Sequence, residues 1–108
     1  MKERKIVMLM VVREDCPWCK KMARKTLTKK PVMAFIDKNF VPVIMYRDRD
    51  KKKFPIDYQT PRVPAIFYIN PKGHEVWTSI GYRNVEDLLY DFDEANQGYI
   101  EEITGVEH

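Results

Sequence analysis

Two cysteines, Cys16 and Cys19, are the residues of this 108-residue chain whose type and spacing most directly suggest chemistry. They enclose Pro17 and Trp18 in the tetrapeptide Cys-Pro-Trp-Cys. One close pair is too few for the disulfide framework of a small secreted protein, but its spacing suits thiol–disulfide exchange or half of a metal site. A chain of this length buries more than about 60% of its unfolded surface, so it folds without a covalent staple. The pair is therefore predicted to have a chemical function.

The metal alternative requires two further ligands for a tetrahedral zinc ion. The two histidines, His74 and the terminal His108, do not have ligand-like spacing, and His74 is interpreted as a solvated strand residue after a turn. We therefore expect no metal and no cofactor, with an iron–sulfur cluster shared by two copies as a remaining alternative. An inert buried pair is not expected either, because a turn at Cys16 should expose the first thiol.

Charge is divided unevenly along the chain. The 19 Lys and Arg against 16 Asp and Glu give a net charge of +3, yet every residue from Asn84 onward that carries a charge at pH 7 is an acid. The basic stretch between Lys20 and Lys30 lacks interleaved aromatic residues and any recognised nucleic-acid module. We therefore expect a solvated helix face and no nucleic-acid partner, although such a face can steer acidic proteins toward Cys16.

The longest apolar run, Ile6–Val12, is far shorter than the ~20 residues of a membrane-spanning helix, so no membrane span is expected. Its continuous apolar character, without alternation, is typical of a central strand covered on both faces. Pro17 suits the first turn of a helix, where its missing N–H costs nothing. The apolar stripe of that helix is predicted to be Cys19, Met22, Ala23 and Leu27.

Pro31 is predicted to end this helix and open a second one, with Val32, Phe35 and Ile36 facing the core. Further strands are predicted over residues 40–46, 63–69 and about 74–80, with a turn at residues 70–73. Residues 47–53 are interpreted as a charged loop and residues 54–60 as a loop or a single helical turn. The methionines are interpreted as core filler: Met8, Met10, Met22, Met33 and Met45.

A last helix is predicted to begin after Asn84, whose side chain is a good N-cap. Its apolar stripe consists of Val85, Leu88, Leu89 and Phe92. Gly98 is a plausible stop, which leaves a short acidic end. The predicted order is therefore strand, helix, helix, strand, strand, strand, helix.

With Cys-x-x-Cys at the first strand-to-helix turn, the chain resembles the thioredoxin superfamily over about residues 5–96. Two further matches are Val63-Pro64, at the position of the family's cis-proline, and Gly81, after the last strand. The sequences of Cys16–Lys20, residues 26–32 and residues 39–43 resemble those of thioredoxin-like proteins of the bacterial extracytoplasmic space, including the DsbD C-terminal-domain and SoxW-type groups. The resemblance implies an α/β thioredoxin fold, a four-stranded mixed sheet with helices on both faces. Length and composition predict a single domain over residues 1–108, with a core at about 5–96 and an acidic tail at 97–108.

The resemblance implies a protein thiol–disulfide oxidoreductase that works as a disulfide reductase. Cys16 would be the nucleophile, because the N-terminus of a helix stabilises a thiolate, and Cys19 would resolve the mixed disulfide. A cis Pro64 would face the pair. Residues Val63, Pro17 and Trp18 would contact the substrate, the first through its backbone.

The expected partners are cysteine-containing proteins and an upstream thiol or disulfide that donates or accepts electrons. We expect a monomer that works outside the cytoplasm if an export signal was trimmed from the chain, with the cytoplasm as the alternative. Met10 departs from the family, since thioredoxins proper carry a buried acid at that place, six residues before the first cysteine. Two other functions stay open: a glutaredoxin-like enzyme that uses glutathione, and an adaptor with a thioredoxin fold that binds partners without catalysis.

Overall fold

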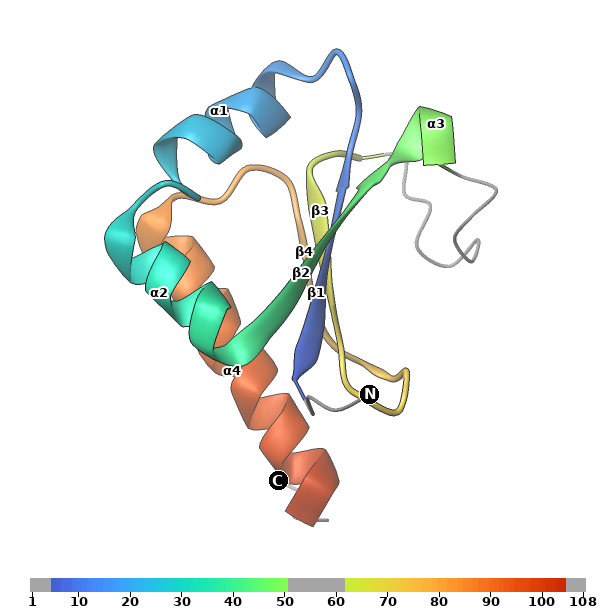
Figure 1. Cartoon of the computed structure of the whole chain (residues 1–108), viewed down its shortest axis with the longest axis vertical. Coiled ribbons are helices and arrows are strands. Elements are labelled where there is room, and N and C mark those ends of the chain that lie inside the picture. Colours follow the sequence, from blue (N-terminus) through green and yellow to red (C-terminus); the bar gives the residue numbers. More distant parts are fainter. Residues whose placement is uncertain (1–4, 51–61, 105–108) are drawn as a thin grey trace.

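The structure, a computed structural model, describes residues 5–50 and 62–104. These residues form a four-stranded mixed sheet in the order β2-β1-β3-β4 (Figure 1). Strands β1 (Ile6–Val12) and β2 (Phe40–Tyr46) are parallel. Strands β3 (Ala65–Ile69) and β4 (Glu75–Ile80) complete the sheet as an antiparallel hairpin, with β3 antiparallel to β1. The predicted mixed sheet is confirmed.

Strand β1 is central and almost completely buried, as its unbroken apolar sequence predicts. Its register with β3 places Val11 opposite Ala65, so the carboxyl end of β1 lies next to the amino end of β3. Cys16 follows β1 by a short turn, and Pro64 directly precedes β3. The pairing of these two strands therefore brings the cysteines and the predicted cis-proline to the same end of the sheet.

Three helices lie on one face of the sheet: α1 (Pro17–Lys25), α2 (Lys30–Asn39) and α4 (Val85–Thr104) (Figure 1). They bury the larger apolar cluster, which includes Met10, Met22, Val32, Tyr68, Leu88 and Phe92. On the other side of the sheet the described residues supply one helical turn, α3 (Arg47–Asp50). The smaller cluster consists of Leu9, Val11, Met45, Ala65 and Phe67. No described helix is long and apolar enough to cross a membrane.

The predicted N-cap at Asn84 and the predicted turn at residues 70–73 are confirmed. The Asn84 carboxamide oxygen accepts the backbone N–H of Asp87 at 2.8 Å and so caps α4. In the hairpin turn, the Asn70 carboxamide oxygen accepts the backbone N–H groups of Lys72 and His74, at 3.0 and 2.8 Å. Gly73 takes a φ of 88°, the left-handed conformation that favours glycine.

Gly98 does not end the last helix, and that prediction is wrong. Helix α4 continues through Gly98 to Thr104, so most of the predicted acidic tail is helical. A Cβ atom at Gly98 would lie 3.1 Å from the carbonyl oxygen of Val76 and 3.2 Å from its Cβ. The missing side chain therefore lets α4 approach β4 closely, and this packing outweighs the low helix propensity of glycine.

Other boundaries and side chains also differ from prediction. Strand β3 begins at Ala65, not at Val63, because the chain bends at residues 62–64. Residues 47–50 form α3, a turn of helix in place of the predicted loop; residues 51–53 and 54–60 lie outside the described part. Ala23 is exposed, and Met33 is 54% exposed, so Met33 is not core filler.

Candidate active site

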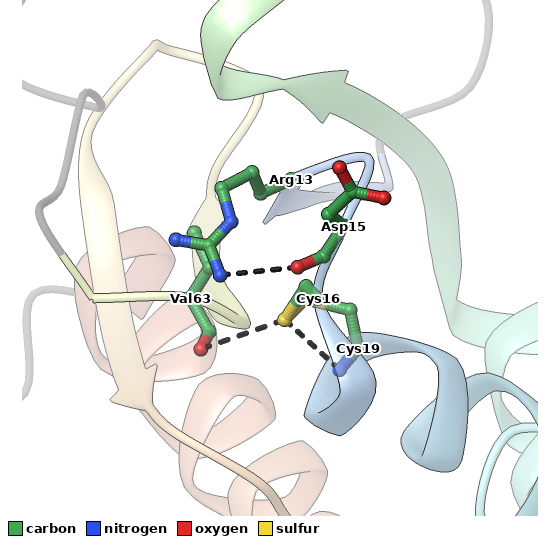
Figure 2. Close-up of a disulfide and its surroundings, with 5 residues drawn as sticks. All are labelled: Arg13, Asp15, Cys16, Cys19 and Val63. Atoms are coloured by element: carbon green, nitrogen blue, oxygen red, sulfur yellow. Dashed lines mark hydrogen bonds between the residues drawn. A yellow bond between two sulfur atoms is a disulfide. The ribbon is translucent and has the colours of Figure 1, made fainter.

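Cys16 and Cys19 form a disulfide with a Cα–Cα distance of 5.2 Å. Cys16 is the N-cap of α1, and the backbone N–H of Cys19 points at its Sγ at 3.2 Å (Figure 2). Pro17 opens the helix, where its missing N–H leaves no bond unmade. In the turn before Cys16, the Arg13 guanidinium donates to the carbonyl oxygen of Asp15 at 3.1 Å. The first sulfur thus lies where free helix N–H groups favour negative charge.

The disulfide is buried. Cys16 is 2% exposed and Cys19 6% exposed, so the expectation that the turn exposes the first sulfur is wrong. The carbonyl oxygen of Val63 lies 4.0 Å from Cys16 Sγ, as Figure 2 shows. An N-cap side chain folds back over the first turn of its helix, and here the Val63 backbone lies against it. The Val63 backbone therefore covers part of the Cys16 sulfur in the disulfide form.

The Val63–Pro64 peptide bond is cis, as expected. Pro64 is fully buried beside the disulfide end of the sheet, and Val63 is half-buried. The carbonyl oxygen of Pro64 accepts the backbone N–H of Gly81 at 2.7 Å. Gly81 has a φ of 97°, which explains why glycine follows β4 at this position.

Trp18, between the two cysteines, is 55% exposed. Its ring packs against the ring of Tyr82, with centroids 5.6 Å apart. The ammonium nitrogen of Lys21 lies 5.1 Å from both ring centroids. One part of the Trp18 ring therefore packs against Tyr82, and the rest faces solvent.

The core below the disulfide contains no acid on β1, where Met10 is 6% exposed. The one buried charged side chain of the described residues is Asp91 on α4, 1% exposed. It accepts Arg83 Nε at 2.8 Å, Arg83 Nη2 at 3.0 Å and Trp77 Nε1 at 3.0 Å. Both carboxylate oxygens of Asp91 therefore accept hydrogen bonds, from Arg83 in the loop after β4 and from Trp77 on β4.

The loop of residues 81–84 connects this buried ion pair with the disulfide end of the molecule. The carbonyl oxygen of Arg83 accepts the hydroxyl of buried Thr26, at the end of α1, at 2.8 Å. Together with the Gly81–Pro64 bond and the Arg83–Asp91 pair, this contact holds the loop at three points. Tyr82 is therefore kept beside Trp18 by its neighbours in the chain.

Comparison with protein families identifies this arrangement. Residues 1–95 match the model of a family described as thioredoxin-like domain.

The chain belongs to the thioredoxin-like domain family.

Several solved structures have the same fold as this thioredoxin-like protein. The reduced C-terminal domain of DsbD from Neisseria meningitidis aligns with a TM-score of 0.68 and 19% identity, over 85% of this chain and 82% of that one. A thioredoxin from Thermus thermophilus aligns with a TM-score of 0.71 and 23% identity, over 90% and 75%. A DsbH oxidoreductase aligns with a TM-score of 0.68 and 16% identity, over 89% and 75%.

This thioredoxin-like protein is a thiol–disulfide oxidoreductase with a Cys-x-x-Cys active site, and its predicted α/β thioredoxin fold is confirmed. Four of the predicted site residues meet at one place: Cys16, Cys19, Val63 and Pro64. Pro17 and Trp18 lie at the exposed rim of this group. His74 lies in the hairpin turn at the opposite end of the sheet, and His108 is outside the described residues. Within residues 5–50 and 62–104 no three potential ligands of His, Cys, Asp or Glu type gather to hold a metal.

Sequence reasoning missed Tyr82 and the Asp91–Arg83 pair, and it placed Lys21 on the basic helix face without its contacts to the two rings. Asp91 did leave a signal, because it lies on the buried stripe of α4, three residues after Leu88. An acid at such a position needs a partner, and Arg83 is the base nearest to it in the sequence. Tyr82 left no comparable signal, since nothing in its spacing pairs it with Trp18.

Proposed function

We propose that this protein is a disulfide reductase for proteins, with Cys16 as nucleophile and Cys19 as resolving cysteine. The Cys16 thiolate attacks a disulfide of the partner, forms a mixed disulfide and releases one partner thiolate. Cys19 then attacks Cys16 Sγ as a thiolate, having lost its proton to water, and the second partner sulfur leaves. The partner gains two electrons, and the Cys16–Cys19 disulfide forms again.

The position of Cys16 at the N-cap of α1 carries this proposal. Its sulfur lies at the helix N-terminus and receives the N–H of Cys19, so the thiolate is favoured without a separate base. Cys19 is one turn along the same helix, at the 5.2 Å Cα separation that lets it attack the mixed disulfide. These two positions support the proposed roles of Cys16 as attacking and Cys19 as resolving cysteine.

The partner would bind across the segment at Val63 and Pro64, next to Cys16. An extended peptide can pair with exposed backbone by adding a strand-like segment, and the Val63 carbonyl faces the disulfide. Trp18 and Pro17 are exposed at the rim and would contact the same partner. No cofactor takes part, because an upstream dithiol would return the protein to its reduced form.

Reduction, not oxidation, is the proposed direction because the described residues give Cys16 Sγ one hydrogen-bond donor. Strongly oxidising members of this scaffold owe their potential to extra stabilisation of the reduced form. The exposed acids Glu14 and Asp15, directly before Cys16, oppose such stabilisation, whereas exposed Lys20 and Lys21 on α1 favour it. We expect a reduction potential near thioredoxin's, about −270 mV, measured by equilibration with dithiothreitol. A value near −120 mV, typical of strong oxidants, would reverse the proposed direction.

Trapping tests the exchange mechanism. Cys19→Ser should accumulate mixed disulfides with partner proteins through Cys16, seen as adducts that dithiothreitol removes. The matched control Cys16→Ser should accumulate none. If Cys19→Ser forms no adducts, the exchange mechanism fails; if Cys16→Ser still retains partners, the adaptor function is supported instead. Adducts with glutathione alone would support the glutaredoxin-like alternative.

We further propose that the protein works outside the cytoplasm as a monomer of one domain. The support is its sequence similarity to extracytoplasmic thioredoxin-like proteins and a reductase chemistry that suits a disulfide-forming compartment. Fractionation of cells that express the gene with its genomic N-terminus tests the compartment. Sedimentation at micromolar concentration tests the oligomeric state.

A further inference from the structure

We propose that Lys21, held between the rings of Trp18 and Tyr82, selects partners that carry an acidic side chain next to their reactive cysteine. This inference rests on the proposed reductase function and names its substrate class. We call Trp18, Lys21 and Tyr82 the cationic platform. It stands on the first turns of α1 and on the 81–84 loop, beside the disulfide.

The geometry of the platform holds the charge of Lys21 in place. Residues Trp18 and Lys21 are three apart on α1, so their side chains share one helix face. The ammonium nitrogen lies 5.1 Å from the centroid of each ring, within the range of cation–π attraction. Two aromatic faces therefore position a flexible side chain before any partner arrives, which lowers the entropy that binding costs.

The platform lacks a negative partner. Among the described residues, the interactions of Lys21 are those with the two rings, and no carboxylate pairs with it. Helix α1 carries Lys20, Arg24 and Lys25 on its surface and no acid. The exposed acid Glu14, in the turn before Cys16, lies 3.5 Å from Arg49. A carboxylate from a docked protein is thus the group that complements this surface.

Tyr82 stays in the cationic platform because hydrogen bonds fix the position of the 81–84 loop. Gly81 donates to the carbonyl oxygen of Pro64, and Arg83 is bound to Asp91 and Thr26. The same loop therefore contacts the cis-proline segment and completes the platform. A partner that lies along Val63 would carry the residues flanking its cysteine toward Lys21.

Two matched peptides test this inference. Each holds a single cysteine as a mixed disulfide with thionitrobenzoate, and the residues that flank the cysteine are Glu in one peptide and Gln in the other. The reduced protein attacks through Cys16, and release of the coloured thiolate gives the rate. We expect the Glu peptide to react about two- to fivefold faster than the Gln peptide, the size of an exposed ion pair. Higher ionic strength should reduce this ratio.

Variants assign the preference to Lys21. Lys21→Gln should bring the rate ratio of the two peptides to about one, and Lys21→Arg should restore it. The matched control is Lys72→Gln, which removes the same charge at the opposite end of the sheet and should keep the wild-type ratio. A wild-type ratio of one, or an equal loss in Lys72→Gln, would overturn the inference while leaving the reductase function intact. Failure of the reduced wild-type protein to release any thiolate would instead overturn the reductase function.

Discussion

Two buried regions of this protein lie under the helices of one face of the sheet, and in the described part of the chain only one of them contains a charged side chain. Below the disulfide, β1 presents Met10 and no acid. Beside the 81–84 loop, α4 buries Asp91 with three hydrogen bonds to Arg83 and Trp77. The chain therefore contains a buried carboxylate, but its partners hold a loop at the rim of the active site.

This difference shows why a carboxylate that is tolerated in one region would be destabilising in the other. A buried charge is tolerated only where donors meet it, and Asp91 has such donors while the surroundings of Met10 are apolar. Tyr68 lies near the same carboxylate, and its buried hydroxyl finds no hydrogen-bond partner among residues 5–50 and 62–104. Burial, and then the charge of Asp91, raise the pKa of Tyr68 well above its usual value.

The largest effect is expected when an acid is placed below the disulfide. Met10→Asp should cost about 5 kcal/mol of unfolding free energy at pH 7, because burial raises the pKa of the introduced carboxyl above the unfolded value of about 3.9. The group must then be protonated to remain buried, at about 1.4 kcal/mol per pH unit above 3.9. The loss relative to wild type should therefore shrink by about 4 kcal/mol between pH 7 and pH 4.

Urea unfolding of Met10→Asp and wild type at the two pH values measures this loss. Met10→Leu, the apolar control, should cost less than about 1.5 kcal/mol at either pH. An equal loss for Met10→Asp at pH 4 and pH 7 would show that the introduced carboxyl finds donors or water there.

Breaking the ion pair at the other region should cost somewhat less. Asp91→Ala should lower the unfolding free energy by about 3–5 kcal/mol, because it leaves Arg83 and the Trp77 indole N–H without their acceptor. Asp93→Ala removes an exposed acid of the same helix and should stay within about 0.5 kcal/mol. Denaturant melts of both variants compare the two positions, and similar losses would contradict a special role for Asp91.

A third prediction concerns Tyr68 at alkaline pH. The folded-state pKa of Tyr68 lies above the unfolded value of 10.0. The neutral Tyr68 side chain therefore contributes fully to the free energy of unfolding below pH 10, and this contribution is lost as the pH rises further. The loss is about 1.4 kcal/mol per pH unit above 10. Tyr68→Phe should not show this loss, which unfolding at pH 9, 10 and 11 would detect. Parallel curves for the variant and wild type would mean that the hydroxyl ionises equally in both states.

The smallest expected effect concerns the contact between Trp18, beside the disulfide, and Tyr82, in the loop that Asp91 holds through Arg83. A double-mutant cycle on Trp18 and Tyr82 should give a coupling free energy of about 0.5–1.5 kcal/mol, the usual range for an aromatic pair. In an Arg83→Gln background the 81–84 loop loses its charge contact with Asp91, so the coupling should fall. Unchanged coupling would show that Tyr82 is held by the Gly81 and Thr26 contacts alone.

Much of the architecture was predictable because local chemistry decides it. The apolar run Ile6–Val12 became the central strand with those bounds, and Asn84 and Asn70 form the predicted cap and turn. Gly98 was misread because a glycine that ends a helix and a glycine that packs in its middle have the same local sequence signal. Only the position of Val76 on β4 distinguishes the two.

By itself, the sequence determined the order of the four strands and of α1, α2 and α4, and the Cys16–Cys19 pair at a helix N-terminus, since each depends on residues close in the chain. The tertiary structure alone decided that Cys16 is buried against Val63, that Asp91 meets Arg83 and that Lys21 rests between two rings. Burial and side-chain pairing depend on which segments the sheet brings together. Cys16 and Val63, and likewise Lys21 and Tyr82, are far apart in the chain, and no local pattern records those contacts.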